Sequence, residues 1–145
     1  MPTPAENKAA VLKFYEESHR GNLEVYDTMI APDFINHGVG PIPDMKGPEA
    51  FKQAYIMYIT AFPDFDTPPQ IVIAEGDYVM LYGPATGTHL GDFMGLPPTG
   101  KKLQWSGVSI YRFNQEGKIV ERWQELNALG LMQQLGVIPP MGGGR

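Results

Sequence analysis

The chain has 145 residues, of which 43% are hydrophobic and 19% are charged, with a net charge of −5 and no cysteine. This length and composition fit one globular domain with its own core, and they exclude an intrinsically disordered chain. The acidic balance and the scattering of the 11 basic residues argue against nucleic acid as a partner, because phosphate binding requires clustered Lys and Arg.

Four segments of the chain are predicted to be helical. In the clearest of them, apolar residues recur every three or four positions, Pro48 suits the first helical position, and Pro63 ends the pattern. The second segment can begin at an Asn22 cap. The fourth can begin at an Asn127 cap and stops at Gly136, a residue type that commonly ends helices. The predicted helices are residues 5–19, 22–30, 48–62 and 128–135.

Four strands are predicted in the second half of the chain. Residues 75–77 and 114–117 have the length and composition of hairpin turns, since each combines Gly with Asp, Asn or Glu. Residues 90–100 are rich in Gly and Pro, which is typical of a loop between two strands. The predicted strands are residues 70–74, 78–89, 101–113 and 118–126.

The order of these elements indicates the fold class. Helices come first and are followed by strands joined through hairpins, which indicates an α+β fold rather than an alternating α/β fold. We expect a strongly curved antiparallel sheet with three N-terminal helices across its concave side. This single domain is predicted to span residues 1–136, and residues 137–145 form a tail whose last five residues are expected to be disordered.

The last predicted strand has mixed faces. Glu121, Trp123 and Glu125 alternate on one face, while Arg122 and Gln124 lie on the other. Such a strand lies either at a wet sheet edge or beside an internal polar cavity. We favour a cone-shaped pocket between the sheet and the helices, because polar residues share faces with large aromatic residues.

The N-terminal segment and the uncharged stretches bear on location. The N-terminus has neither the basic region nor the apolar run of a signal peptide. The longest uncharged run, residues 78–91, is too short to span a bilayer and is interrupted by Gly and Pro. We therefore expect a soluble cytoplasmic protein without a membrane partner.

No motif for a cofactor or a metal is present in the sequence. There is no P-loop, no Gly-x-Ser-x-Gly elbow and no dinucleotide fingerprint, and the histidines and carboxylates lack metal-ligand spacing. Without cysteine there is no thiolate nucleophile and no disulfide. We therefore expect no cofactor and no metal, and general acid–base chemistry is the class that the remaining side chains support.

The candidates for acid–base chemistry are Tyr15, His37, His89, Glu121 and Glu125. A carboxylate beside a tryptophan would be desolvated, which raises its pKa and suits it to proton transfer. The alternative is that each histidine is a loop residue bonded to nearby backbone. Glu121 would then form a structural ion pair with an arginine on the sheet.

The two tryptophans, Trp105 and Trp123, lie on neighbouring predicted strands. They either pack in the core or line the pocket of an aromatic ligand. We expect both of them, together with Ser109 and either Glu121 or Gln124, to face one enclosed pocket.

Eight stretches of the sequence match a known pattern: in chain order, APDFINHG, GPEAFKQAY, FPDF, IAEGDYV, GTHLGDFMGLPPTGKK, YRF, GKIVERW and LGLMQQLG. Together they resemble the SnoaL-like polyketide cyclase family, whose members are also called ester cyclases. The resemblance runs over nearly the whole chain in the same order. It implies the nuclear-transport-factor-like α+β fold with a deep apolar pocket, commonly in a homodimer or homotetramer.

The resemblance also implies a reaction. Characterised members close a ring in a polyketide methyl ester by intramolecular aldol addition, without metal or cofactor: a side chain removes a proton from a carbon between carbonyl groups, and the enolate attacks another carbonyl. Tyr15 matches a pocket tyrosine of the family, and His37 and Trp123 match residues common in the wider family. The family's acid–base aspartate and its histidine correspond to Gln124 and Ser109 here. A glutamine amide cannot accept a proton at neutral pH.

We therefore predict a cyclase-type enzyme that acts on a small apolar or polyketide-like carbonyl compound by cofactor-free acid–base chemistry in an enclosed pocket. One alternative is a non-catalytic binder of a small aromatic or apolar metabolite, and another is an epoxide-opening or ester hydrolase of the same fold. The predicted catalytic residues are His37, Glu121, Gln124 and Glu125. The predicted substrate-binding residues are Tyr15, Phe51, Tyr55, His89, Trp105, Ser109 and Trp123.

Overall fold

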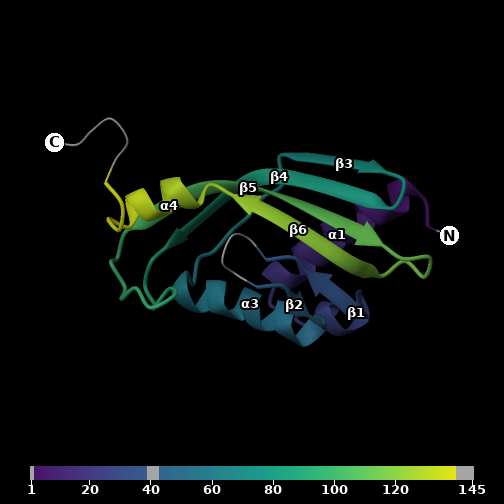
Figure 1. The fold of residues 1–145 in the computed structure, drawn as a ribbon, viewed down its shortest axis with the longest axis horizontal. Coiled ribbons are helices and arrows are strands. Elements are labelled where there is room, and N and C mark those ends of the chain that lie inside the picture. Colours follow the sequence, from purple (N-terminus) through teal and green to yellow (C-terminus); the bar gives the residue numbers. More distant parts are fainter. Residues whose placement is uncertain (1, 39–42, 140–145) are drawn as a thin grey trace.

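One sheet of six strands organises the part of the chain that the computed structural model describes, residues 2–38 and 43–139. The strand order is β2-β1-β6-β5-β4-β3, and the long strands form a layer above α3, β1 and β2 (Figure 1). The strands are β1 (Ile30–Asn36), β2 (Met45–Lys46), β3 (Ile71–Glu75), β4 (Tyr78–Thr88), β5 (Lys102–Phe113) and β6 (Ile119–Leu126). The helices are α1 (Pro4–His19), α2 (Val25–Thr28), α3 (Pro48–Ala61) and α4 (Ala128–Gln134).

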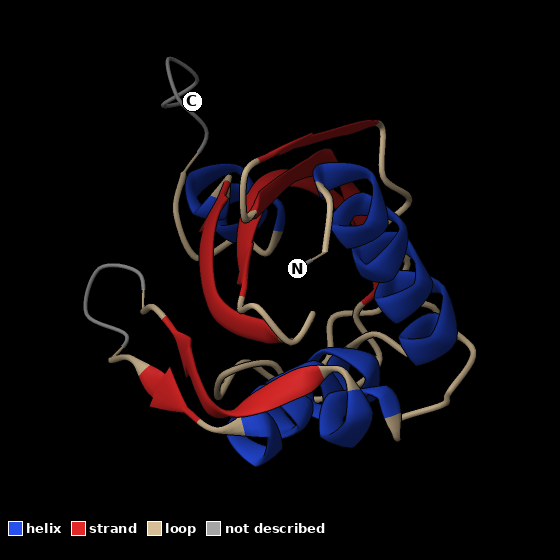
Figure 2. Ribbon diagram, turned by 90° about the vertical axis from the view of Figure 1, so that its right-hand side faces the viewer, coloured by secondary structure: helices blue, strands red, loops and turns tan. Residues whose placement is uncertain are grey.

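The sheet curves strongly around the interior and stays open (Figure 2). The α+β fold predicted from the order of the elements is confirmed. One strand pair departs from the antiparallel sheet that we predicted: β1 runs parallel to β6, with Asn36 opposite Arg122. The other pairs are antiparallel.

Strand β1 is absent from the sequence prediction because Pro32 lies within it. Proline has no N–H for the strand ladder and usually argues against a strand. The structure accommodates Pro32 at an irregularity, since the pairing of β1 with β6 changes register between Ile30 and Ile35. The same segment shortens the second helix: residues 22–30 are predicted helical, but α2 covers only Val25–Thr28 and Ile30 already belongs to β1.

The helix ends follow signals in the sequence. The Thr3 hydroxyl accepts a hydrogen bond from the Glu6 N–H at 3.1 Å, and the Glu6 carboxylate accepts one from the Thr3 N–H at 3.0 Å, which makes a capping box. Helix α3 begins at Pro48 as predicted. The Asn127 side chain accepts from the Gly130 N–H at 2.9 Å, so the predicted cap of α4 is confirmed.

Two clusters of buried apolar side chains hold the helices on the sheet. The first joins α1, α2 and α3 to β1, β4 and β5, and it contains Phe51. The second joins the end of α3, the 90–100 loop and α4 to the other ends of β4 and β5, and it contains Trp105. The second cluster consists of Ala61, Phe62, Ala85, Phe93, Leu103, Trp105, Leu131 and Leu135.

The C-terminal tail follows Gly136, which has a φ of 81° and ends the last helical turn. Val137 and Ile138 are exposed apolar residues just beyond it. The predicted disorder of the last five residues lies outside the described part of the chain.

Within residues 2–38 and 43–139, no helix is long and apolar enough to cross a membrane.

The strand register assigns the side chains of β5 and β6 to two faces. Arg112 pairs with Glu121 and Phe113 with Ile119, so Val120 is an extra residue in β6, a β-bulge. From Glu121 onward the alternation is regular. The side chains that face the helices are Trp105, Ser109, Tyr111, Arg122 and Gln124, and those on the outer face are Ile110, Arg112, Glu121, Trp123 and Glu125.

Candidate active site

The outer face of the sheet carries a polar cluster around His37. Its Nε2 lies 2.6 Å from Glu121 Oε2, and Glu121 Oε1 accepts a hydrogen bond from Arg112 Nε at 2.7 Å. Asp44 lies 3.6 Å from the other ring nitrogen, and the ring stacks on Trp123 with 4.9 Å between the centroids. The ion pair between Glu121 and an arginine on the sheet, one of the two alternatives, is therefore present.

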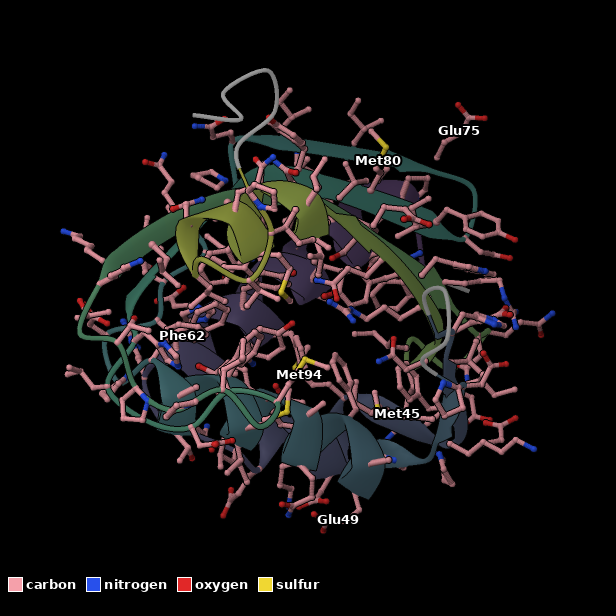
Figure 3. All side chains as sticks on the ribbon, turned by 60° about the vertical axis from the view of Figure 1, so that its left-hand side comes forward. Met45, Glu49, Phe62, Glu75, Met80 and Met94 are labelled. Atoms are coloured by element: carbon pink, nitrogen blue, oxygen red, sulfur yellow. The ribbon has the colours of Figure 1, made fainter. Side chains whose placement is uncertain are left out.

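The expectation that Trp123 and Trp105 share one pocket is wrong. Trp123 and Glu121 lie on the outer face, whereas Trp105 and Ser109 lie on the helix side, because a side chain changes face with every residue along a strand. Figure 3 shows Met80 of β4 pointing away from the helices, on the same outer face. That face has a groove of about 580 Å³, lined by Tyr78, Met80, Ile110, Trp123 and Glu125.

Hydrogen bonds in the outer cluster control the ionisation of Glu121. Partial burial raises the pKa of its carboxyl, but hydrogen bonds from His37 and Arg112 outweigh burial and lower the pKa below its ordinary value. A carboxyl whose pKa is lower in the folded state than in the unfolded state stabilises the fold at pH values above its pKa in the unfolded state. This contribution is lost as the pH falls through the folded pKa.

We therefore expect Glu121→Gln to lower the free energy of unfolding by about 1 kcal/mol near neutral pH, the scale of a partly exposed ion pair. The difference between the variant and the wild type should vanish in acid, where the wild-type carboxyl is also uncharged. Urea denaturation of both proteins across the acid range measures this. A difference that does not change with pH would contradict the ionic contribution.

The helix side of the sheet holds a buried guanidinium, that of Arg122. Nε donates to the Tyr111 hydroxyl at 3.2 Å, Nη1 to Asn36 Oδ1 at 3.2 Å and Nη2 to Ser109 Oγ at 3.3 Å. The guanidinium carbon lies 5.0 Å from the centroid of the Phe51 ring. These partners are neutral, and within the described ranges Arg122 forms no ion pair with a carboxylate. Burial lowers the pKa of Arg122, but the facing tyrosine oxygens outweigh burial and raise it, so the group is charged.

A directed chain of hydrogen bonds runs from Arg122 to the first helix. Because a guanidinium can only donate, the Tyr111 oxygen accepts from Arg122, and the Tyr111 hydroxyl donates in turn to the Tyr15 oxygen at 3.0 Å. Burial raises the pKa of Tyr111 well above its ordinary value, although the charge of Arg122 acts against this. Tyr111 therefore stays protonated, and its hydroxyl donates a hydrogen bond to the Tyr15 oxygen. Because the Tyr15 oxygen already accepts this hydrogen bond, the Tyr15 hydroxyl can donate its own proton to a further acceptor.

Tyr15 lines a pocket of about 310 Å³ between α1 and the segment 66–69, a size suited to a small molecule. His19, one turn further along α1, lines the same pocket. Its Nδ1 lies 2.8 Å from the main-chain oxygen of Tyr15, and its Nε2 lies 2.9 Å from Thr67 Oγ1. The lining residues are Leu12, Tyr15, Glu16, His19, Asp66, Thr67, Pro68 and Pro69.

Sequence reasoning misses His19 as a candidate. The only local signal is its position four residues after Tyr15, which places both side chains on one side of a helix. Its partner Thr67 is 48 residues away in the chain, so the hydrogen bond between them has no sequence signature.

Two predicted substrate-binding residues, His89 and Tyr55, form hydrogen bonds with main-chain atoms of the protein. His89 is fully buried, packs against Phe62, and accepts a hydrogen bond from the Thr99 N–H at Nδ1, as expected for a histidine bonded to backbone. Its Nε2 has no partner among residues 2–38 and 43–139. The half-buried Tyr55 donates its hydroxyl proton to the main-chain oxygen of Ser18 at 3.2 Å.

Among the residues predicted to be catalytic, Gln124 alone lies on the helix side of the sheet, half-buried and opposite Ser109. His37, Glu121 and Glu125 lie on or above the outer face. The structure therefore separates His37, Glu121 and Glu125 from the interior network, which contains the acid–base candidate Tyr15. In the described ranges, no three His, Asp or Glu side chains gather closely enough to hold a metal ion.

The curved sheet, the helices on its concave side and the polar network between them define a class of small α+β proteins. The family model described as SnoaL-like polyketide cyclase matches residues 9–135. The chain belongs to this family, as the resemblance in the sequence implies.

Two relatives of known activity are similar along most of their length. Aklanonic acid methyl ester cyclase DauD of Streptomyces sp. (strain C5) is 27% identical over 128 residues, which cover 87% of this chain and 79% of DauD. Nogalonic acid methyl ester cyclase of Streptomyces nogalater is 29% identical over 122 residues, which cover 80% of this chain and 87% of the relative.

Solved structures share the fold. AclR of Streptomyces galilaeus, a candidate hydroxylase, has a TM-score of 0.82 and is 31% identical, with 94% of this chain and 100% of AclR covered. IdmH of Streptomyces antibioticus, a candidate polyketide cyclase, has a TM-score of 0.76 and is 29% identical, with 90% of this chain and 99% of IdmH covered.

Proposed function

We propose that the protein is a cyclase-type enzyme that acts on a small apolar or polyketide-like carbonyl compound by intramolecular aldol chemistry, without a cofactor. The observation that carries this proposal is the hydrogen-bond chain Arg122–Tyr111–Tyr15, which delivers a hydroxyl donor to the pocket wall. A donor that is held in place by a buried cation suits a carbonyl oxygen that gains negative charge as an enolate forms. Membership of the family and the cyclase relatives support ring closure as the reaction.

In this proposal the interior side chains divide into donors and apolar contacts. Tyr15 donates to the reacting carbonyl oxygen, and Ser109 and Gln124, which face the helices from neighbouring strands, hold other polar groups of the substrate. Phe51, Tyr55 and Trp105 are not part of the wall of the pocket of about 310 Å³, so in this proposal they contact the part of the substrate that extends from that pocket into the interior. Residues 1–136 form the single SnoaL-like domain that carries this site.

The catalytic roles predicted for His37, Glu121 and Glu125 require a substrate in the outer groove instead. The histidine–carboxylate contact of 2.6 Å is the observation in favour of that second site. His37→Gln distinguishes the two sites, because a base in the outer groove would be lost in this variant and the interior network would be unchanged.

We also propose that the protein assembles as the homodimer or homotetramer that the family resemblance implies. Ile71, Ile73 and Tyr78 on the outer face of β3 and β4 are 49%, 52% and 47% exposed, and they adjoin the apolar outer groove. A second copy of the chain would cover this surface. A monomer in sedimentation experiments would contradict the assembly.

The function is tested with nogalonic acid methyl ester, the compound in the name of one relative. We expect ring closure to a product with the mass of the substrate. We expect Tyr15→Phe to lower kcat by about 100-fold, the effect of losing one donor to a developing oxyanion. Tyr82→Phe, a matched change on the outer face of β4, should leave kcat unchanged.

The products separate the competing functions. Binding without turnover would favour the non-catalytic binder, and uptake of water or release of methanol would favour the hydrolase. A product heavier by one oxygen atom would favour a hydroxylase, as named for AclR. Each of these results would contradict the cyclase proposal.

A further inference from the structure

Removal of the substrate proton requires a base, and the interior face of the sheet does not supply one. Gln124 lies on this face opposite Ser109, and its amide is not basic. Glu121 and His37 lie on the other side of the sheet from Tyr15. His89 is fully buried among aromatic rings and is not part of the pocket wall.

His19 presents a basic nitrogen in this pocket. Its Nδ1 lies 2.8 Å from the main-chain oxygen of Tyr15, and a carbonyl oxygen can only accept, so in the neutral ring Nδ1 carries the proton. Nε2 then carries the lone pair and accepts a hydrogen bond from the Thr67 hydroxyl at 2.9 Å. The backbone thus selects the tautomer in which the nitrogen away from the helix is the basic one.

His19 and the Tyr15 hydroxyl can reach the same ligand. The two residues are one helical turn apart on α1, their rings stack with 6.0 Å between the centroids, and both line the pocket. The Phe65 ring also stacks on His19, at 6.1 Å, and the Tyr55 ring meets it edge-on at 5.8 Å. These contacts restrict the imidazole, so a base and a hydroxyl donor are held side by side.

We propose that His19 Nε2 is the base of the ring-closing reaction, an inference that rests on the proposed function. The bond between hydrogen and the carbon that lies between two carbonyl groups breaks, and the proton passes to Nε2. The electron pair stays on the substrate as an enolate, whose oxygen accepts from the Tyr15 hydroxyl. The enolate carbon then bonds to a second carbonyl carbon, and the oxygen of that carbonyl takes the proton back from His19. Substrate and product are isomers, so no oxidant or reductant is consumed.

In the free protein the Thr67 hydroxyl donates a hydrogen bond to the lone pair of Nε2. The proposed reaction requires this hydroxyl to rotate away when the substrate binds. The same hydrogen bond also connects the 66–69 segment to α1. The test therefore has to distinguish the role of His19 as a base from its role in holding this segment in place. A glutamine at position 19 keeps a hydrogen-bonding amide but has no basic nitrogen. An alanine leaves space for free imidazole, which can restore a base but not an anchor.

The experiment follows nogalonic acid methyl ester in D₂O and measures deuterium incorporation and ring closure separately. We expect His19→Gln to slow both steps by about 100-fold or more in kcat with little change in KM, the usual scale for a lost general base. Tyr82→Phe on the outer face of β4, outside both pocket walls, is the control and should keep the wild-type rate. Added imidazole should restore a measurable part of kcat to His19→Ala and leave His19→Gln unchanged.

Wild-type kcat in His19→Gln would overturn the assignment and leave the proposed function standing. A large loss of kcat in Asp66→Asn together with wild-type kcat in His19→Gln would overturn it as well, and would assign the base to Asp66, one of the two carboxylates, with Glu16, that line the same pocket. If the wild-type protein catalysed neither deuterium incorporation nor ring closure, both the proposed function and the assignment of His19 would fail.

Discussion

An Arg122→Met variant is expected to stay folded and to lose about 100-fold of kcat on nogalonic acid methyl ester. Methionine keeps much of the length of the side chain but removes the charge and the donor to Tyr111. Tyr15 then becomes a weaker and less well-directed donor. Because Arg122 acts through Tyr111 and Tyr15, KM should change little, and Arg122→Met combined with Tyr15→Phe should lose little more than Tyr15→Phe alone.

Stability should respond much less than activity. A buried charge without an ion-pair partner is costly, so its removal offsets the hydrogen bonds that are lost with it. We expect the free energy of unfolding to stay within about 2 kcal/mol of the wild type, as measured by urea denaturation. Arg122→Lys, which keeps a buried cation, should retain more activity than Arg122→Met. Wild-type kcat in Arg122→Met would show that the hydrogen-bond chain has no part in the reaction.

Phe51→Ala is expected to lower the free energy of unfolding by about 3–5 kcal/mol, which is a large fraction of the stability of a small domain. The Phe51 ring stacks on Phe34 at 5.1 Å and on Phe14 at 5.8 Å, meets Tyr26 edge-on at 5.2 Å, and lies under the Arg122 guanidinium. Truncation would leave a cavity among α1, α2, α3 and β1, because these rings are held by different elements.

Urea denaturation with a two-state fit measures the effect. Phe51→Leu keeps most of the volume and should cost about 1–2 kcal/mol, so the pair of variants separates cavity formation from the loss of ring stacking. A loss below about 1 kcal/mol for Phe51→Ala would mean that the core can close around the gap.

Much of the secondary structure could be predicted because its signals are local. Pro48 and Pro63 bound α3 in the sequence, and the helix ends within one residue of the predicted end. The hairpin turns contain Gly76 and Gly117, whose φ values of 56° and 80° suit glycine far better than other residues. Strand β1 escapes prediction because the stabilising partner of a strand with Pro32 is β6, which lies far along the chain.

The site could be predicted only in part. Tyr15 follows from the family resemblance, and the structure shows its side chain at the pocket. The hydrogen-bonded partners in the network that contains Tyr15 lie far apart in the sequence. Tyr111 is 96 residues from Tyr15, and Asn36 is 86 residues from Arg122. The placement of Trp123 away from Trp105 depends on strand pairing and not on residue type.

The sequence by itself determined the α+β class, the family, and the positions of the helices and hairpins, because these depend on spacing, capping and turn residues that are neighbours in the chain. Only the tertiary structure decided which polar residues share a space. The bulge at Val120 changes the face on which residues lie, and helix packing brings His19 to Thr67 and Arg122 to a ring of neutral acceptors. Contacts between distant residues create these chemical environments, and residue spacing carries no record of them.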